Sequence, residues 1–432
     1  MRPNAAIDRA PWHANRYLRA VLVSAVFAQL GIWIRNFAVL LCVMERSGGD
    51  AYAVALVSVA EYAPIFLFSI VGGAFADRWR PRRTLILCEW LSAASILGVW
   101  VAVAVGHWHL DFCATLVSAI LSQFSQPAGM KLFKRHVPDA DMPAGMAAIQ
   151  TIFSVFLIVG PALGTFVYAH LGIDAALLLT AAAFVLSALS LAAVPKDESA
   201  AEGAPSPSPG PSPMPAQNVP IEQTRLTAQL ADGFRYLLRS RVLSLLSLSF
   251  AIVGLGVGLI QPLGAFLVTE RLGLPLTALQ WIAIPYGAGE LIGGLLVLKL
   301  AGKLSPQRLL ALGLLVNAAG IAVTGLSPWL WLCMAAQFAI ALLQPAIFAG
   351  NAALTMQHTE EAMIGRVTGI RTPLLIGAML LSMSLAGTLK THVPLVLLYV
   401  CSGLLFAVAW MTLAPIRRMP ASPSVNSAPQ HG

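Results

Sequence analysis

Twelve runs of apolar residues follow one another along this 432-residue chain, separated by short polar connections. Each run is long enough for a helix that crosses ~30 Å of hydrocarbon, which takes about 20 residues. Hydrophobic residues make up 58% of the chain and charged residues 11%, a balance that a water-soluble domain cannot bury. The sequence therefore predicts an all-α polytopic membrane protein with 12 transmembrane helices. The predicted spans are 17–42, 51–76, 84–105, 110–130, 146–170, 174–194, 243–268, 277–300, 306–326, 328–352, 366–389 and 393–414.

The positive charges alternate from side to side along these spans. If both termini are cytoplasmic, all but four of the 27 Lys and Arg residues fall in cytoplasmic segments. The exceptions are Arg35, inside the first span, and Arg46, Arg271 and Lys390 on the far side. This bias predicts cytoplasmic N- and C-termini. Because the cations form no single patch, the net charge of +8 indicates topology and not nucleic-acid binding. We expect a multi-pass protein of the bacterial inner (plasma) membrane.

The composition changes abruptly at residues 195–220 to Pro, Ser, Ala and Gly. Such a segment cannot bury a core and is typical of an extended tether. It predicts an N-terminal six-helix bundle at 1–194, a cytoplasmic linker at 195–241, a C-terminal six-helix bundle at 242–416 and a disordered tail at 417–432. Within the linker, apolar residues recur at every third or fourth place of 222–241, which favours an amphipathic helix lying on the cytoplasmic face, with a soluble cap as the alternative.

The two halves also resemble each other weakly. An offset of 225 residues places Pro81 on Pro306 and Arg83 on Arg308. An internal repeat of this kind is typical of transporters built from two parallel six-helix units.

A glycine-rich and arginine-rich turn, residues 72–83, joins the second and third spans. Its pattern Gly-x-x-x-Asp-Arg-x-x-x-Arg-Arg is formed by Gly73, Asp77, Arg78, Arg82 and Arg83. This pattern at this position resembles the signature of the major facilitator superfamily. The resemblance implies two pseudo-symmetric bundles and transport by alternating access.

Three further segments, 160–164, 232–238 and 361–370, resemble the enterobactin exporter and macrolide efflux branch of that superfamily. The resemblance implies export of small molecules at the expense of the proton gradient. Unlike the multidrug antiporters of the superfamily, the fourth predicted span has no Arg.

The charged turn is interpreted as a conformational latch. The resemblance implies that it docks against the cytoplasmic start of the eleventh span in the outward-facing state. There Asp77 would meet cations and a helix N-terminus. The alternative is that the charges only fix topology. The latch prediction comprises Gly73, Asp77, Arg78, Arg82, Arg83, Gly365, Arg366 and Arg371.

Arg35, Glu61 and Glu290 lie deep within spans, where each costs about 2.5–3.5 kcal/mol to insert. Arg35 in the first span and Glu61 in the second are predicted at similar depths, so they could form an ion pair that links proton and substrate binding, or one that only orients two helices. Glu290, near the middle of the eighth span, is expected to be mostly protonated and is the first candidate for a proton carrier. Its alternative role is a neutral hydrogen bond to a neighbouring helix.

Two other sets of residues are candidates for a role in transport. Gly160, Pro161 and Gly164 predict a helix bend that packs between the two halves, or an ordinary kink. The second set is Gln123, Gln126, Gln261 and Gln344, on helices that line the cavity in this superfamily. They are candidate substrate contacts, although hydrogen bonds between helices explain them equally well.

The sequence has no catalytic, metal-binding or nucleotide-binding motif. His107 and His109 have no partner cluster in the sequence, so we expect no metal site. The chain has no phosphate-binding Gly-x-x-x-x-Gly-Lys-Ser/Thr motif. We therefore expect no enzyme activity and no cofactor, with the proton gradient as the driving force.

The sequence thus favours a secondary active transporter, expected to be monomeric, that exports a drug-like or siderophore-like molecule by proton antiport. A lysophospholipid flippase or an uptake transporter of the same fold is the main alternative. A membrane-embedded lipid enzyme is a remote one, because it needs acids or histidines clustered at one interface and the acids here are scattered.

Overall fold

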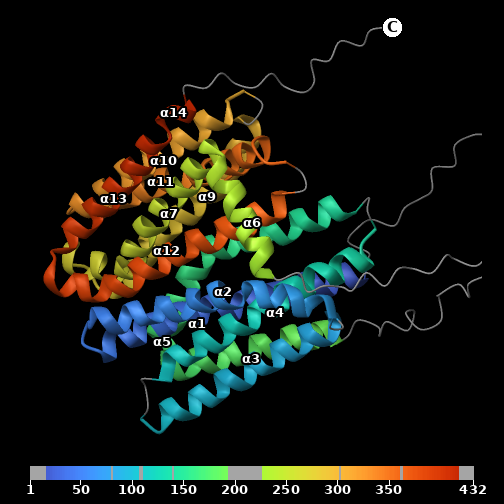
Figure 1. The fold of residues 1–432 in the computed structure, drawn as a ribbon. Coiled ribbons are helices and arrows are strands. Elements are labelled where there is room, and N and C mark those ends of the chain that lie inside the picture. The colour runs from blue at the N-terminus through green and yellow to red at the C-terminus, as the bar shows by residue number, and fades with distance from the viewer. Residues whose placement is uncertain are drawn as a thin grey trace, which may run out of the picture.

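The computed structural model describes residues 16–78, 81–106, 110–138, 141–192, 226–300, 303–360 and 363–417, and every element in these ranges is helical. The first group of helices (Figure 1) comprises α1 (Arg16–Arg46), α2 (Ala51–Arg78), α3 (Pro81–Ala104), α4 (Asp111–His136) and α5 (Met142–Ala192). The second comprises α6 (Leu226–Arg239), α7 (Arg241–Ile260), α9 (Leu279–Leu300), α10 (Pro306–Leu326), α11 (Leu330–Gln357), α12 (Ile364–His392), α13 (Leu395–Thr412) and α14 (Ala414–Arg417). Between α7 and α9 lie the short helices η3 (Gln261–Leu263), α8 (Gly264–Phe266), η4 (Leu267–Arg271) and η5 (Leu276–Ala278).

Ten helices of the described residues are long and apolar enough to cross a membrane. One of these ten is α5, which contains two crossings. The helix α4 is an additional crossing by its length of 26 residues, about 39 Å. Its Gln123 and Gln126 make it more polar than the others. With α4 and the two arms of α5 the predicted 12 crossings are accounted for, and the all-helical polytopic fold is confirmed.

The two arms of α5 meet at Gly172, the residue in this helix whose dihedrals leave the helical region (φ 78°, ψ 180°). Both arms pack on the same part of α1. Gly164 approaches Phe37 from one arm, and Thr180 of the other arm donates a hydrogen bond to the Gly31 carbonyl at 3.4 Å. The chain therefore reverses at Gly172, where a left-handed φ is readily adopted only by glycine. The predicted spans 146–170 and 174–194 are joined by this one residue.

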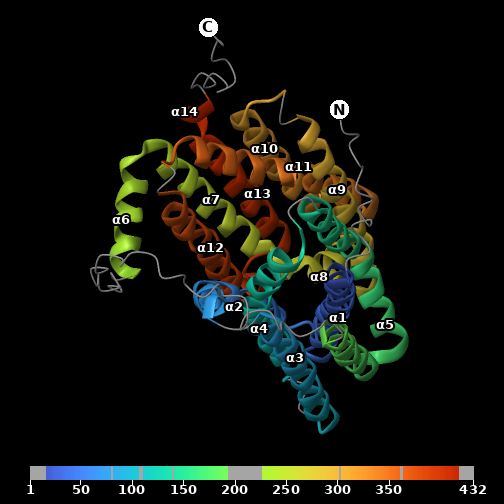
Figure 2. The ribbon, with the colours of Figure 1, turned by 90° about the vertical axis from the view of Figure 1, so that its right-hand side faces the viewer.

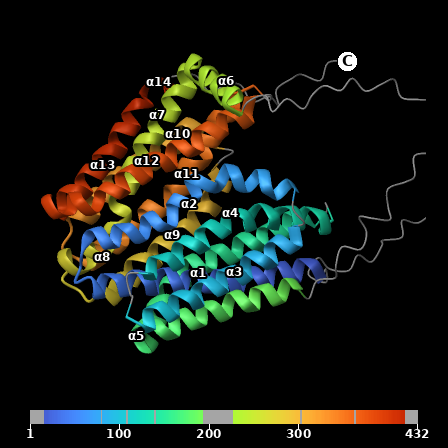
Figure 3. The ribbon, with the colours of Figure 1, turned by 60° about the horizontal axis from the view of Figure 1, so that its bottom comes forward.

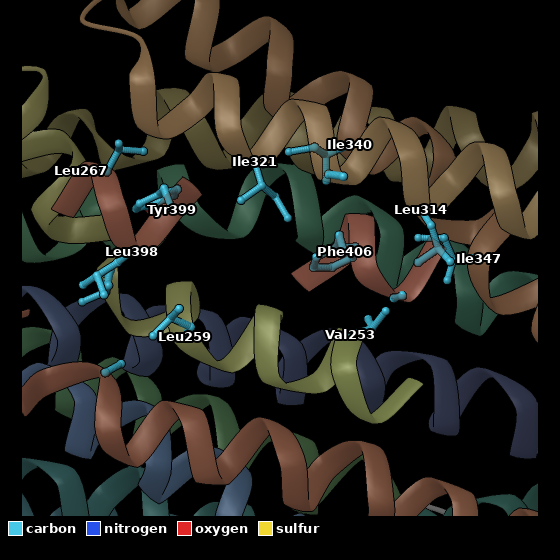
Figure 4. Close-up of a cluster of buried hydrophobic side chains, with 14 of the residues drawn as sticks. Val253, Leu259, Leu267, Leu314, Ile321, Ile340, Ile347, Leu398, Tyr399 and Phe406 are labelled. Atoms are coloured by element: carbon cyan, nitrogen blue, oxygen red, sulfur yellow. The ribbon is translucent and has the colours of Figure 1, made fainter. Parts of the chain in front are cut away.

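Most of the buried core of the second group is one large apolar cluster, part of which Figure 4 shows. Phe406 of α13 is 1% exposed and lies between α7 and α10 in this cluster. Within a bilayer the lipid is as apolar as the side chains, so helices associate through close packing. Glycines provide it here. A Cβ on Gly254 of α7 would lie 2.5 Å from the Leu375 carbonyl oxygen of α12.

The two groups of helices are in contact from one side of the molecule to its middle, where Gly287 of α9 lies against Leu157 of α5. That side, called the outer side here, is the one where α1 ends and α2 begins. Met44, Ala51 and Val54 belong to the same buried cluster as the second group. Gly387 of α12 lies against the backbone of Ala51 and Tyr52. We call these contacts the outer seal.

The opposite side, which the charge distribution predicts to be cytoplasmic, has separate cores. Leu85, Leu132 and Leu191 form a buried cluster within the first group, and Val297 and Leu309 form one within the second. The two groups approach each other near α8 and diverge toward α6 (Figure 3). In the described residues the two groups are therefore packed together on the outer side and have separate cores on the opposite side.

The linker helix ends earlier than predicted. Among the described residues it covers Leu226–Arg239, and Ser240 is the N-cap of the next helix, α7, where its Oγ accepts a hydrogen bond from the Leu243 N–H at 3.4 Å. Residues 222–225 lie outside the described residues. The predicted tether at 195–220 lies outside the described residues. Of the predicted tail at 417–432, Arg417 is the last residue of α14 and the rest lies outside the described residues.

Adjacent glycines of α9 provide a test of the packing. A Cβ on Gly293 would collide with the Leu342 carbonyl of α11, whereas one on Gly294 would meet nothing within 4 Å. We expect Gly293→Leu to lower the free energy of unfolding by about 1–3 kcal/mol, and Gly294→Leu to change it by less than about 0.5 kcal/mol. Thermal unfolding of the two detergent-solubilised variants measures this, and equal midpoints would contradict the packing described here.

Candidate functional site

A buried arginine and a half-buried acid are joined by an asparagine. Arg35 of α1 is 3% exposed. Its Nη2 and Nε donate to Asn36 Oδ1 at 2.7 and 3.1 Å, and Asn36 Nδ2 donates to Glu61 Oε1 of α2 at 2.9 Å. An amide suits this place because it accepts on one atom and donates from the other. From the sequence Arg35 and Glu61 could form an ion pair; the hydrogen bonds that connect them pass through Asn36, which sequence reasoning missed. Its polarity within an apolar run was the available signal.

One nitrogen of the Arg35 guanidinium donates no hydrogen bond. Nη1 is buried and has no hydrogen-bond partner. A buried donor left without a partner costs about 1–3 kcal/mol. The neighbouring Asn36 and Glu61 are half-buried, so the group is not sealed on all sides. The site therefore contains a buried, positively charged donor without a partner.

Two tyrosines extend this group across the interface between the bundles. Tyr62 follows Glu61 on α2 and interacts electrostatically with Glu61 and with Tyr286 of α9. Tyr286 in turn interacts with Glu290, one helical turn further along α9. The two acids predicted separately, Glu61 and Glu290, thus belong to one neighbourhood that spans both bundles. We call Arg35, Asn36, Glu61, Tyr62, Tyr286 and Glu290 the central polar cluster.

The depth of the cluster follows from the helices that hold it. Glu290 lies at the middle of α9, and Gly289 beside it packs on the Phe338 carbonyl oxygen of α11, 2.5 Å from an added Cβ. Gly287 lies against Leu157 of α5 in the other bundle. These glycines bring α9 close to both neighbours. Sequence reasoning missed Tyr62 and Tyr286, although each lies within one helical turn of a predicted acid.

The predicted glutamines lie elsewhere. Gln123 donates to Ser122 Oγ at 3.1 Å and to the Ala119 carbonyl at 3.5 Å, both in its own helix. Gln126 and Gln261 are exposed, and Gln344 is half-buried with a buried Oε1 that has no partner. The hydrogen bonds described for these side chains do not reach the central polar cluster. Their role as substrate contacts stays a prediction.

The N-terminal part of the predicted latch lies at the end of α2 and the start of α3. Gly73, Asp77 and Arg78 are in the last turns of α2, and their side chains lie outside the described residues. Arg82 Nη2 donates to the Ala192 carbonyl at the end of α5, at 2.8 Å, and Arg83 is exposed. Arg82 therefore joins α3 to α5 within one bundle.

The other part of the predicted latch is the start of α12, where Gly365 is the second residue. Arg366 is exposed and Arg371 is buried. Arg371 donates to Ser247 Oγ of α7 at 3.0 Å and to Asn351 Oδ1 of α11 at 2.6 Å, and also to Thr355. Its guanidinium lies 5.7 Å from the centre of the Phe250 ring. In this conformation Arg371 binds α7 and α11 of its own bundle, and Arg366 is the accessible cation.

The predicted bend motif is a packing surface. The backbone of α5 stays helical through Gly160, Pro161 and Gly164, and leaves the helical region later, at Gly172. Gly160 lies against the Trp33 ring of α1. A Cβ on Gly164 would lie 2.7 Å from Phe37 Cβ. The two glycines of the motif thus pack within their own bundle, because they let the bulky side chains of α1 approach the α5 backbone. Packing of the motif between the two halves stays a prediction.

Metal ligands do not gather in the part of the chain that the structure describes, where no group of three or more His, Cys, Asp or Glu residues could hold an ion. His107 and His109 lie outside the described residues.

The central polar cluster combines a charged donor, carboxyls and phenols at an interface between two bundles. Such a set of groups suits binding and proton exchange.

Comparisons with known proteins agree with this architecture. The family model of the Major Facilitator Superfamily matches residues 21–372. The uncharacterized MFS-type transporter YkuC of Bacillus subtilis is 25% identical over 385 residues, 87% of this chain and 86% of the relative. The multidrug efflux pump Tap of Mycobacterium tuberculosis is 26% identical over 429 residues, 95% of each chain.

Solved structures show the same fold. The nucleoside transporter NupG superposes with a TM-score of 0.70 at 12% identity, over 93% of this chain and 100% of that one. A bacterial homologue of the human lysosomal transporter Spinster, in an inward-facing and unoccupied conformation, gives 0.65 at 14% identity, over 96% and 100%. With the family match covering most of its length, this chain is a multi-pass membrane transporter, not an enzyme, and belongs to the Major Facilitator Superfamily.

Proposed function

We propose that this transporter exports small organic molecules, drug-like or siderophore-like, across the bacterial inner membrane in exchange for protons. The observation that carries the proposal is the central polar cluster, which spans the interface between two bundles that are packed together on the outer side and have separate cores on the opposite side. Two curated relatives of similar length support an MFS-type transporter, and the one named a multidrug efflux pump supports the export direction.

Arg35 sets the class of substrate. Its open Nη1 donor favours molecules that carry an anionic or strongly accepting oxygen, such as a catecholate. Of the two kinds of cargo that the branch resemblance implies, the siderophore-like kind presents such oxygens, so Arg35 favours it over macrolide-like cargo. The substrate enters from the cytoplasmic side, where the two groups of helices diverge.

Proton and substrate binding are coupled through charge. While Glu61 is ionised, it compensates Arg35 through Asn36. When Glu61 binds a proton, that compensation is lost, so the protonation state of Glu61 changes how strongly Arg35 holds an anionic group. For exchange, the transported proton binds Glu290 only after the substrate has left the cluster. By linkage, a substrate bound to Arg35 changes the proton affinity of Glu61 by the same factor. Glu290 is the proton carrier of the other bundle, and the two tyrosines lie between the acids.

The latch completes the cycle in this proposal. In the outward-facing state Asp77 pairs with the start of α12, where Arg366 is exposed and available. Breaking that pair returns the protein to the conformation described here. The transporter works as a monomer.

Drug accumulation in cells tests the export proposal. A strain that lacks this protein should accumulate more enterobactin or more of a macrolide such as erythromycin than the same strain carrying it. Plasmid-borne wild-type protein should restore the lower level. Equal accumulation of both compounds with and without the protein would remove the efflux function, and lower accumulation in the deletion strain would indicate uptake.

The proton role of Glu290 is tested in proteoliposomes. We expect Glu290→Gln to abolish substrate-induced proton movement, because an amide cannot bind and release a proton in this pH range. Glu270→Gln is the matched control, since Glu270 lies in η4 and pairs with Lys390 of α12 at 2.8 Å, outside the central polar cluster. A trapped pH-sensitive dye reports the proton flux. Wild-type flux in Glu290→Gln would move the role to Glu61.

The amide bridge is tested by replacing Asn36. Asn36→Leu keeps the size of the side chain but removes both hydrogen bonds, leaving Arg35 and Glu61 without their shared partner. We expect transport to fall at least tenfold, which corresponds to about 1.4 kcal/mol, and the pH at half-maximal transport to shift. The measurement is initial transport rate against pH; a wild-type profile would show that the bridge has no part in coupling.

A further inference from the structure

We propose that α6 is a membrane-binding element, in which Phe234 and Leu238 insert into the cytoplasmic leaflet and Arg235 and Arg239 bind the phosphates of anionic lipids. The proposal concerns the surface of the transporter and does not depend on the direction of transport or on the central polar cluster. It rests on where α6 is docked, on the surface next to it and on the charges that it exposes.

One face of α6 is fixed to the second bundle. A Cβ on Gly233 would lie 2.9 Å from Ile370 Cδ1 and 3.1 Å from Arg366 Cβ, so α6 lies directly on the first turns of α12. Leu237, one turn along on the same face, is 4% exposed. Beside this face the Tyr236 hydroxyl accepts a hydrogen bond from the Glu360 N–H at 3.1 Å. The orientation of α6 is therefore set by the protein.

The part of α12 under α6 continues into a lipid-facing stripe. Ile370, which contacts Gly233, shares one side of α12 with Leu374, Leu381 and Leu385, because these positions are separated by four or seven residues. The three leucines are 42%, 59% and 49% exposed. Leu381 and Leu385 lie near the outer seal, where the two bundles touch, so their exposed side faces lipid. The helix α6 thus crosses this stripe at its cytoplasmic end, at the rim of the bundle (Figure 2).

The exposed side chains of α6 match the membrane surface at that place. Phe234 is 53% and Leu238 is 59% exposed, and they are four residues apart on one side of the helix. Arg235 and Arg239 are exposed on the next side, with Asp232 among them, and Arg241 follows at the start of α7. Apolar side chains beside a net positive face are typical of helices that lie in the headgroup region of anionic bilayers. Since α6 leads through Ser240 alone into the spanning helix α7, it is held at that depth.

Spin-label accessibility tests this proposal in the full-length protein. The five native cysteines are replaced, and a nitroxide is attached at position 234, 238 or 232 in vesicles of phosphatidylethanolamine and phosphatidylglycerol. Labels at 234 and 238 should collide more with oxygen, which dissolves in lipid, than with a water-soluble nickel chelate. The label at 232, on the charged side, should show the reverse.

The charge contribution is measured with the label at 234. Replacing phosphatidylglycerol by phosphatidylcholine, or introducing Arg235→Gln and Arg239→Gln, should lower the ratio of inserted to free helix by about fivefold for each arginine interaction lost. Lys303→Gln, an exposed cation on the connection between α9 and α10, is the matched control and should leave the ratio unchanged.

Three results would overturn the proposal. Nickel access at 234 and 238 equal to that at 232 would place the apolar pair in water. Shielding of both positions from both reagents would mean that a protein segment covers them. Insertion that is independent of lipid charge and of the two arginines would remove the phosphate interaction.

Discussion

The contact between α2 and α12 on the outer side determines what the rest of the molecule can do. Gly387 allows the α12 backbone to reach that of Ala51 and Tyr52, and Met44 and Val54 join the buried core of the second bundle. Close packing of backbones is the main source of helix affinity in lipid. On the cytoplasmic side the cores stay separate. The conformation of the described residues is thus set by a small apolar contact on the outer side.

The central polar cluster depends on this arrangement. Its members come from α1, α2 and α9, so the charges of Arg35, Glu61 and Glu290 share an environment only while the bundles meet near their middle. Charged groups inside a membrane are retained where they have a function or a partner. The amide of Asn36 makes the cluster adjustable. It connects Arg35 and Glu61 through hydrogen bonds to one intervening side chain. Glu61 can therefore change its charge, or Arg35 its partner, without breaking a direct ion pair.

The sequence was sufficient for the features that depend on length and on charge. Apolar runs, alternating cations and the residues 73–83 predicted the fold class and the family, because crossing a bilayer imposes a strict length and polarity on each helix. The position of Glu290 at the middle of its helix followed from counting residues along the predicted span.

Gly172 could not be recognised from the sequence as the single turning residue, since that depends on both arms of α5 packing against α1. Asn36, Tyr62 and Tyr286 were missed for a related reason. Their roles come from helix rotation and from contacts between bundles, which the pattern along one helix does not contain. Likewise Arg371, expected at a surface contact, turned out to be buried among Ser247, Asn351 and Phe250.

That burial of Arg371 has a mechanical consequence. One guanidinium holds α7, α11 and α12 together near their cytoplasmic ends, through hydroxyl, amide and aromatic partners. Separating any of these helices from the others would leave the Arg371 guanidinium without partners in a nonpolar medium. The free-energy cost of that is far larger than the cost of moving one glycine-lined helix surface over another. The three helices are therefore expected to move together as one rigid body. The conformational change of transport then takes place at the interface with the first bundle.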